Sequence, residues 1–232
     1  MSPQGIYAAA AGMAAQQAWL DAVSNDMANL QTDGYKQERV GFRELVTGAG
    51  AAEVDGGRSF RQGTLVESTE PLAIAIDGPG FIQVRSASGQ TALTRGGVFH
   101  IDAQGSLVSA TGALLVPPIR LPKGTTPDQV QIDADGTVHV GNARLGRISL
   151  VNVPAPQALQ SAGDGLYVPT AASGAPTAVR SSLVKQGFLE ASNVDVASAM
   201  TDLLQAQRGY ELQSRVVQLQ DQLLEIANGI RR

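Results

Sequence analysis

The sequence has no cysteine, few aromatic residues and no long apolar run, and each absence excludes a class of protein. Without cysteine, the chain can form neither disulfides nor a thiolate site. Aromatic residues make up 4% of the chain and its formal net charge is −4, so the composition gives no sign of nucleic-acid binding. No stretch approaches the roughly 18 apolar residues that are needed to span a bilayer. We therefore expect a protein that is soluble when it is made.

Basic residues are also absent before Lys36. A secretory signal peptide has a positively charged start followed by a continuous apolar segment, and Gln16 and Gln17 would interrupt such a segment here. We therefore expect no cleaved signal peptide.

Apolar residues recur at alternating spacings of three and four near both ends of the chain, which predicts two long helices with apolar faces. The first pattern, in which only Gln16 is polar, consists of Ile6, Ala9, Met13, Gln16, Leu20, Val23, Met27 and Leu30. The second pattern, called here the C-terminal stripe, consists of Leu212, Val216, Leu219, Leu223, Ile226 and Ile230. A neighbouring set at intervals of seven, called here the heptad stripe, consists of Val196, Leu203, Tyr210, Val217 and Leu224.

Two neighbouring stripes form a face that is too broad for one partner helix. This width leaves two interpretations open. The two helices could form an intramolecular hairpin, or the C-terminal helix could pack among several helices of an assembly.

Capping residues predict where the two helices begin and end. The first helix should cover about residues 3–30, and Gly34 suits the left-handed turn that follows it. The second helix should begin after a cap at Ser192 or Asn193, with Asp195 in its first turn, and continue to about residue 227.

Short strand-like segments separated by turn residues lie between the helices. Residues 101–107 and 132–138 share the pattern of a strand, an Asp-x-x-Gly turn and a second strand, which predicts a repeated hairpin. The predicted fold class is α+β. N- and C-terminal helices form a coiled-coil-like core segment, and an all-β middle domain consists of short antiparallel strands.

The predicted domain organisation has three parts. Residues 1–35 and 188–232 form the terminal helical core segment, residues 36–65 form a loop-rich connector, and residues 66–187 form the β-rich middle domain.

Possible chemical motifs are better explained by turns and strands. Gly78-Pro79-Gly80 is followed by a strand and lacks a third glycine, so it favours a turn over a phosphate loop. Asp133 and Asp135 resemble the start of a calcium loop, but Arg144 occupies the position of the bidentate glutamate. Both histidines lie in strand patterns. We therefore expect no catalytic, metal or cofactor-binding site.

Five segments carry a resemblance to a known family. Residues 24–36 are similar to the pattern N-N-x-A-N-x-x-T-x-G-[FY]-K, and residues 189–196 and 206–211 to L-E-x-S-N-V-D-V and A-Q-R-x-Y-E. Between them, residues 78–84 and 94–99 resemble G-x-G-F-F-x-V and T-R-x-G-x-F. These patterns are typical of the bacterial flagellar rod and hook family, and they occur here in the family's order.

The resemblance implies a function for the termini. In this family the terminal segments are weakly structured in the monomer and pair as concentric helices in the core of a tubular polymer, with the β domain outside. The implied assembly interface consists of Ile6, Met13, Leu20, Val23, Met27, Asn29, Leu30, Val196, Leu203, Tyr210, Leu212, Val216, Leu219, Leu223 and Ile226. The implied family turn consists of Thr32, Gly34, Tyr35 and Lys36.

Length narrows the choice within the family. The middle segment has room for one modest β domain, which favours a rod subunit over hook proteins with further outer domains. Residues 114–122 and 130–138 most resemble distal rod members. A proximal rod subunit is the alternative, because Asp26 replaces the usual second asparagine and the connector is short.

The expected function is that of a structural axial subunit, not an enzyme, that polymerises into the distal rod and transmits torque from motor to hook. Its expected partners are further copies of itself, other rod and hook proteins and the flagellar export apparatus, with no nucleic acid or small-molecule substrate. It should reside in the flagellar basal body, within the cell envelope. A secreted monomeric binding module, with both helices folded onto the β domain, is the alternative outside the family.

Overall fold

The computed structural model describes residues 4–44, 51–86, 89–179 and 181–230, and it is α+β, as the sequence predicts. Its α-helices are α1 (Gln4–Ala28) and α2 (Val196–Ile230). Contacts divide the chain into two units. The helical unit consists of Met1–Leu30, Glu38–Gly57 and Val194–Arg232, and the β unit consists of Gln31–Gln37 and Arg58–Asn193.

The strands are short, as expected for the middle of the chain. They are β1 (Glu38–Glu44), β2 (Ala51–Arg58), β3 (Leu65–Glu67), β4 (Ala73–Asp77), β5 (Phe81–Arg85), β6 (Thr91–Thr94), β7 (Gly96–Ile101), β8 (Leu107–Ser109), β9 (Leu114–Leu115), β10 (Val130–Ile132), β11 (Thr137–Val140), β12 (Ala143–Arg147), β13 (Leu150–Asn152), β14 (Gln160–Gly163), β15 (Leu166–Val168), β16 (Thr177–Ala178), β17 (Leu183–Gln186) and β18 (Phe188–Glu190). Two 3₁₀ turns, at Pro127–Gln129 and Pro156–Ala158, connect some of them.

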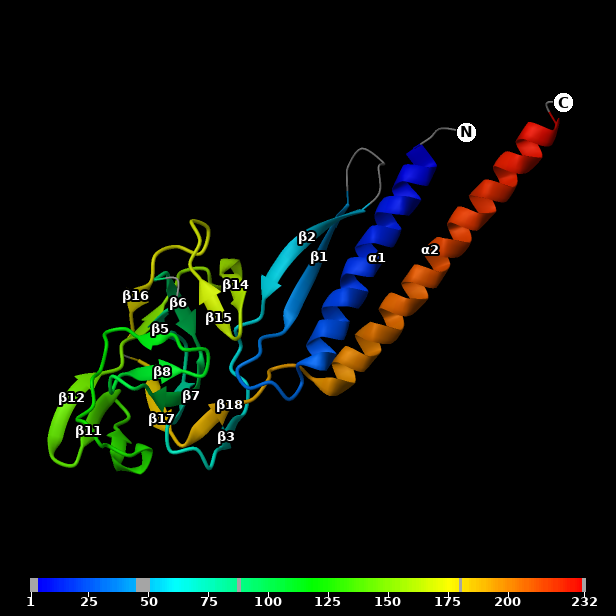
Figure 1. Cartoon of the computed structure of the whole chain (residues 1–232). Coiled ribbons are helices and arrows are strands. Elements are labelled where there is room, and N and C mark those ends of the chain that lie inside the picture. Colours follow the sequence, from blue (N-terminus) through cyan, green and yellow to red (C-terminus); the bar gives the residue numbers. More distant parts are fainter. Residues whose placement is uncertain (1–3, 45–50, 87–88, 180, 231–232) are drawn as a thin grey trace. The chain divides into compact units, whose positions relative to one another are not determined.

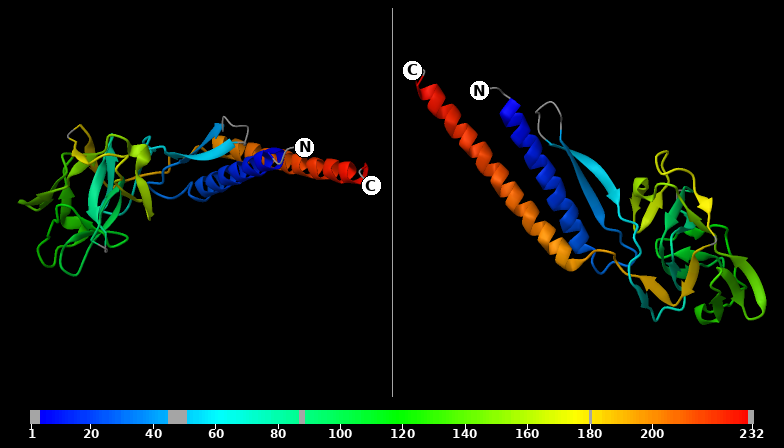
Figure 2. Two further views of the ribbon diagram at one scale, coloured as in Figure 1. Left: turned by 90° about the horizontal axis from the view of Figure 1, so that it is seen from above. Right: turned by 180° about the vertical axis from the view of Figure 1, so that it is seen from behind.

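In the helical unit, α1 and α2 lie side by side and run in opposite directions (Figures 1 and 2). Gly12 of α1 lies beside Gln213 of α2, and Gln16 lies beside Gly209, which fixes the antiparallel register. None of the described helices is long and apolar enough to cross a membrane.

The connector predicted as loop-rich contains two strands instead. β1 and β2 pair as a two-stranded sheet, and β1 contacts α1. The buried carboxylate of Asp26 accepts a hydrogen bond from the backbone N–H of Glu38, 3.0 Å away, at the start of β1. The glycines in this segment suggested loops, but a paired backbone and a contact with a helix favour strand even where residue preference is weak.

The β unit contains one large sheet that folds over the main hydrophobic core. Its strand order is β14-β15-β6-β5-β9-β8-β7-β4-β17, with β13 paired to β5 and β16. A smaller sheet of β10, β11 and β12 and the pair β3–β18 complete the unit. Side chains from β4, β5, β7, β8 and β11, including Ile74, Ile76, Phe99 and Val138, are fully buried in this core.

The repeated hairpin is confirmed. Ile101 pairs with Leu107 across the first turn, and Ile132 pairs with Val138 across the second. In both, the glycine of the Asp-x-x-Gly turn has a positive φ, 80° at Gly105 and 85° at Gly136. Only glycine adopts this conformation at little cost, which explains why both turns carry it at the same place.

The cap of α2 differs from the prediction. Asp195 is the residue whose side chain accepts a hydrogen bond from the backbone N–H of Ser198, at 2.8 Å, and this bond lowers the pKa of the Asp195 carboxyl. Asn193, predicted as a candidate cap, uses its side chain within the β unit, where it accepts from the Gln37 N–H and donates to Ser59 O. Because two long-range contacts already occupy the amide, it is not available to cap the helix.

Candidate assembly surface and the buried ion cluster

Helix α2 carries large apolar side chains that are exposed to solvent. Seven aliphatic or methionine side chains of this helix have exposed fractions of 43% or more, and they are Val196, Met200, Leu204, Leu212, Val216, Leu219 and Ile226. In the described β unit, the exposed large hydrophobic residues are Val66, Leu114 and Leu183. A concentration of exposed apolar side chains on one helix is typical of an interaction surface.

The contact between α1 and α2 is made mainly by small residues. Ala15 and Ala22 of α1 are buried, as are Ala199 and Ala206 of α2. On α2, both alanines lie between the two stripes defined above. α1 therefore covers only the middle of the broad apolar face, and the sequence pattern, which ranks residues by size and hydrophobicity, did not single out these alanines.

The structure separates the residues of the predicted assembly interface into two groups. On α1, Val23 is buried and Met13, Leu20 and Met27 are partly buried. On α2, Leu203 is partly buried, whereas the other described members are exposed: Val196, Tyr210, Leu212, Val216, Leu219 and Ile226. The side chains of Ile6 and Leu223 lie outside the described residues.

The last two predicted residues of the first segment, Asn29 and Leu30, lie in the turn after α1. The Asn29 amide donates to the backbone O and to the side-chain Oδ1 of Asn25, at 2.8 and 3.0 Å. Leu30 is partly buried. Asn29 thus closes the end of the helix through a local contact.

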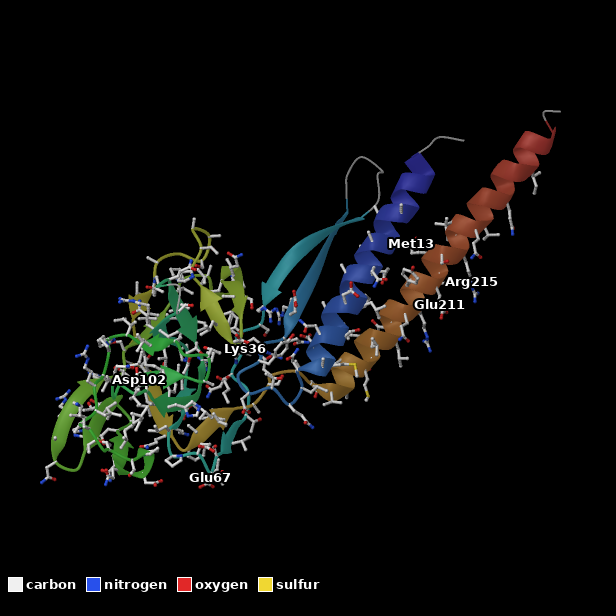
Figure 3. The ribbon with its side chains drawn as sticks, in the orientation of Figure 1. Met13, Lys36, Glu67, Asp102, Glu211 and Arg215 are labelled. Atoms are coloured by element: carbon white, nitrogen blue, oxygen red, sulfur yellow. The ribbon has the colours of Figure 1, made fainter. Side chains whose placement is uncertain are left out.

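The family turn leads into a buried ion cluster in the β unit. Lys36 is fully buried, and its ammonium donates to Oε1 of Glu190 at 2.6 Å and to the backbone O of Arg61 at 2.9 Å (Lys36 is labelled in Figure 3). Arg95 donates from Nε to the other carboxylate oxygen of Glu190, at 2.9 Å. One buried carboxylate therefore pairs with two buried cations.

The ion cluster is defined as Lys36, Arg95 and Glu190. Backbone groups form further hydrogen bonds with these side chains. Oε1 of Glu190 also accepts from the N–H of Gly63 at 2.8 Å. Nη1 of Arg95 donates to the carbonyls of Gly78 and Gly80, at 3.0 and 2.5 Å. The Gly-Pro-Gly segment is thus a turn that presents two carbonyls to a guanidinium.

The ion cluster is strongly desolvated. Burial lowers the pKa of the Lys36 ammonium, and the nearby charge of Glu190 and its hydrogen bond oppose that shift. The Arg95 guanidinium lies 6.0 Å from the ring centroid of Phe81, and its Nη2 has no hydrogen-bond partner among the described residues. Buried charges of this kind are tolerated only while each has its partner.

Other members of the family turn hold the same region together. Gly34 adopts φ +70°, and its N–H donates to the backbone O of Glu190 at 2.6 Å. Tyr35 accepts on its backbone O from the N–H of Asn193, and the guanidinium of Arg58 lies 5.7 Å from its ring centroid. The exposed Thr32 accepts on its carbonyl from the Tyr35 N–H. The motifs near the two ends of the chain therefore meet within the β unit.

Sequence reasoning missed the ion cluster. Lys36 and Glu190 are separated by 154 positions, and no local pattern relates them. The usable signal was that three of the family motifs carry a charged residue, at Lys36, Arg95 and Glu190. Of the two histidines, His139 has one carboxylate neighbour, since its Nε2 lies 2.8 Å from Oδ2 of Asp133. No group of three or more potential metal ligands occurs in the described part of the chain.

Comparison with protein families accounts for the same segments. Residues 6–36 match the family described as flagella basal body rod protein. Residues 75–140 match the D1 domain of flagellar hook protein FlgE/F/G, and residues 185–230 match the C-terminal part of flagellar basal body rod FlgEFG protein. Each match contributes one residue to the ion cluster: Lys36, Arg95 and Glu190.

Individual relatives align along nearly the whole chain. The flagellar basal-body rod protein FlgG of Caulobacter vibrioides is 35% identical over 262 aligned positions, which cover 98% of this chain and 99% of that protein. FlgG of Agrobacterium fabrum is 33% identical, with 97% and 98% covered. The flagellar basal-body rod protein FlgF of Caulobacter vibrioides is 32% identical, with 90% and 88% covered. From this similarity, the chain belongs to the flagellar basal-body rod protein family and is a structural rod subunit.

Proposed function

We propose that this chain polymerises with copies of itself into the distal rod of the bacterial flagellum and helps to transmit torque from motor to hook. Two observations support this assignment. FlgG relatives align with 98% and 97% of the chain, against 90% for FlgF. The helical unit also carries an apolar surface on α2 that it does not cover itself.

The exposed apolar surface of α2 is the observation that carries the proposal. A fully buried leucine or valine side chain contributes about 1.5–3 kcal/mol relative to an exposed one. The single partner α1 buries the small residues in the middle of the face and leaves Leu212, Leu219 and Ile226 outside. Neighbouring subunits can supply the missing contacts, so the energy of burial becomes available only on assembly.

In this arrangement α1 and α2 form a coiled-coil-like pair in the core of the rod. The C-terminal stripe faces helices of neighbouring copies, and the polar side of α2 lies away from α1, where Glu211 and Arg215 project (Figure 3). The predicted interface residues on both helices belong to this core.

The remaining assignments follow from the same proposal. Other rod and hook proteins are the axial neighbours, and the subunit reaches the cell envelope through the flagellar export apparatus. Its function is structural, with no catalysis, cofactor, nucleic acid or small-molecule substrate. A proximal rod position is the second candidate, because FlgF also aligns along most of the chain.

Electron microscopy of isolated basal bodies tests the position of the subunit. An epitope tag inserted at Asp164, an exposed residue in the turn between β14 and β15, should leave the fold intact. Antibody label should then appear on the rod segment next to the hook, in cells that remain motile. Label at the opposite end of the rod would favour the proximal assignment, and basal bodies without label would contradict a rod subunit.

A further inference from the structure

The α1–α2 pair contains two places where a glycine of one helix faces a glutamine of the other. A Cβ atom on Gly209 would lie 2.7 Å from Oε1 of Gln16, and a Cβ atom on Gly12 would lie 3.1 Å from Nε2 of Gln213. Each glutamine therefore occupies space that a glycine leaves open. Glycine inside a helix is unfavourable relative to alanine, so both positions call for a packing reason.

In one contact the glycine belongs to α1 and the glutamine to α2, and in the other contact the two helices exchange these roles. Gln16 follows Gly12 by about one turn on α1, and Gln213 follows Gly209 by about one turn on α2. If α2 slides by one turn in one direction, Gly12 comes to face Gly209 and leaves a gap. If it slides the other way, Gln16 faces Gln213, and two long side chains compete for space between the helices. Both gaps and overpacking are destabilising, so the observed register is favoured over both neighbours.

Gln16 also destabilises the helix pair in a way that a hydrophobic residue would not. Its Oε1 atom is buried and has no hydrogen-bond partner in the part of the chain that the structure describes. A buried polar atom without a partner destabilises a fold, whereas a polar residue in a helix seam can specify register. We propose that Gly12, Gln16, Gly209 and Gln213 fix the axial register of α1 against α2. The proposal does not depend on the assignment as a rod subunit.

The register has a consequence for the apolar surface. α2 extends past the start of α1 (Figure 1), and the register sets how far it does so. A slip of one turn would move the C-terminal stripe along α1 by one turn and change which of its residues a neighbouring molecule meets. The four residues therefore determine specificity more than stability.

The absence of native cysteine allows the register to be read by disulfide formation in the full-length protein. Extending the register of the Gly12–Gln213 and Gln16–Gly209 contacts along the two helices places Ala22 opposite Leu203, and a slip of one turn would bring it opposite Ala199 or Gln207. Three double-cysteine variants, called here reporters, read out the register. Each combines Ala22→Cys with Leu203→Cys, with Ala199→Cys or with Gln207→Cys. After mild oxidation, the reporter at Leu203 should form its disulfide about tenfold faster than the other two, because disulfides need a narrow range of Cα separation.

Two swapped chains separate register from packing. The half swap, Gly12→Gln with Gln213→Gly, keeps a glutamine opposite a glycine at both places, but each slipped register then also has one such pair. The full swap adds Gln16→Gly and Gly209→Gln. With it, only the observed register places a glutamine opposite a glycine, as in the native chain. Both have the composition of the native chain, and circular dichroism should show similar helix content.

We expect the half swap to raise the slipped disulfides about tenfold relative to the native chain, and the full swap to return them to the native level. If the four residues only filled space, the half swap would keep the native ratio of disulfides. That result would overturn the proposal, as would a native chain that forms all three disulfides equally or forms none at Leu203.

Discussion

Replacing Glu190 with glutamine should lower the free energy of unfolding of the β unit by about 3–5 kcal/mol, because it leaves two buried cations without a counter-charge. The substitution keeps the size of the side chain, so the loss reports the charge more than the packing. Lys36 and Arg95 each lose their carboxylate contact at 2.6 and 2.9 Å. Thermal unfolding should show the effect as a decrease in melting temperature of about 10 °C or more.

A surface ion pair provides the matched control. Asp77 and Lys185 lie 2.8 Å apart in the same unit, but both are 42% exposed, and the bond to Lys185 lowers the pKa of Asp77. Asp77→Asn should hardly change the melting temperature, since exposed pairs contribute little. If Glu190→Gln behaved like Asp77→Asn, the ion cluster would not hold the β unit together.

A double-mutant cycle tests the same cluster independently. Lys36→Met should destabilise the native chain, because Glu190 then retains only Arg95. In the Glu190→Gln chain the same change should cost less or even stabilise, since it removes a buried charge that has already lost its partner. Strictly additive effects in the cycle would contradict the coupling.

Leu219→Asp should abolish assembly while leaving the monomer folded. Leu219 is 58% exposed, so the substitution removes few contacts within the subunit. In the polymer, the buried leucine contributes about 2–3 kcal/mol, and a carboxylate in its place is costly to desolvate. Cells should lose motility and rods, while secretion of the subunit and the melting temperature of the β unit stay near the native values.

Gln218→Asp is the matched control for this prediction. Gln218 is exposed and follows Glu211 by seven residues, so it lies on the polar side of α2. The substitution Gln218→Asp introduces the same charge one residue away from Leu219, and cells that carry it should remain motile. If both variants assembled, or if Leu219→Asp lowered the melting temperature of the β unit, the C-terminal stripe would have another role.

Local patterns predicted the regular elements well. The three-and-four spacing located α1 and α2 to within a few residues, and the Asp-x-x-Gly turns located both hairpins. Each of these helices and hairpins depends on residues that are close in sequence, so a sequence pattern can describe it. The alanines between the helices were not foreseen, because small residues reveal a close contact only when the partner is known.

Long-range contacts explain the remaining differences. Asn193 has the features of a helix cap, yet its side chain binds Gln37 and Ser59, and Asp195 caps the helix instead. Lys36 was assigned to the start of the connector and Glu190 to the terminal helical core segment, but both are buried in the β unit. In each case a contact across more than a hundred positions determined the role of the residue.

The central claim is that α2 offers an apolar surface that is covered only in the polymer, and amide hydrogen exchange tests it most directly. In a verified monomer, residues 196–230 should exchange rapidly, because a helix with one partner and an exposed apolar face is only marginally stable. Residues 188–190 should be protected in the same sample, since β18 belongs to the β unit. In assembled rods the amides of α2 should become strongly protected. Strong protection of α2 already in the monomer, without a further increase on assembly, would contradict the claim and favour a self-contained helical hairpin.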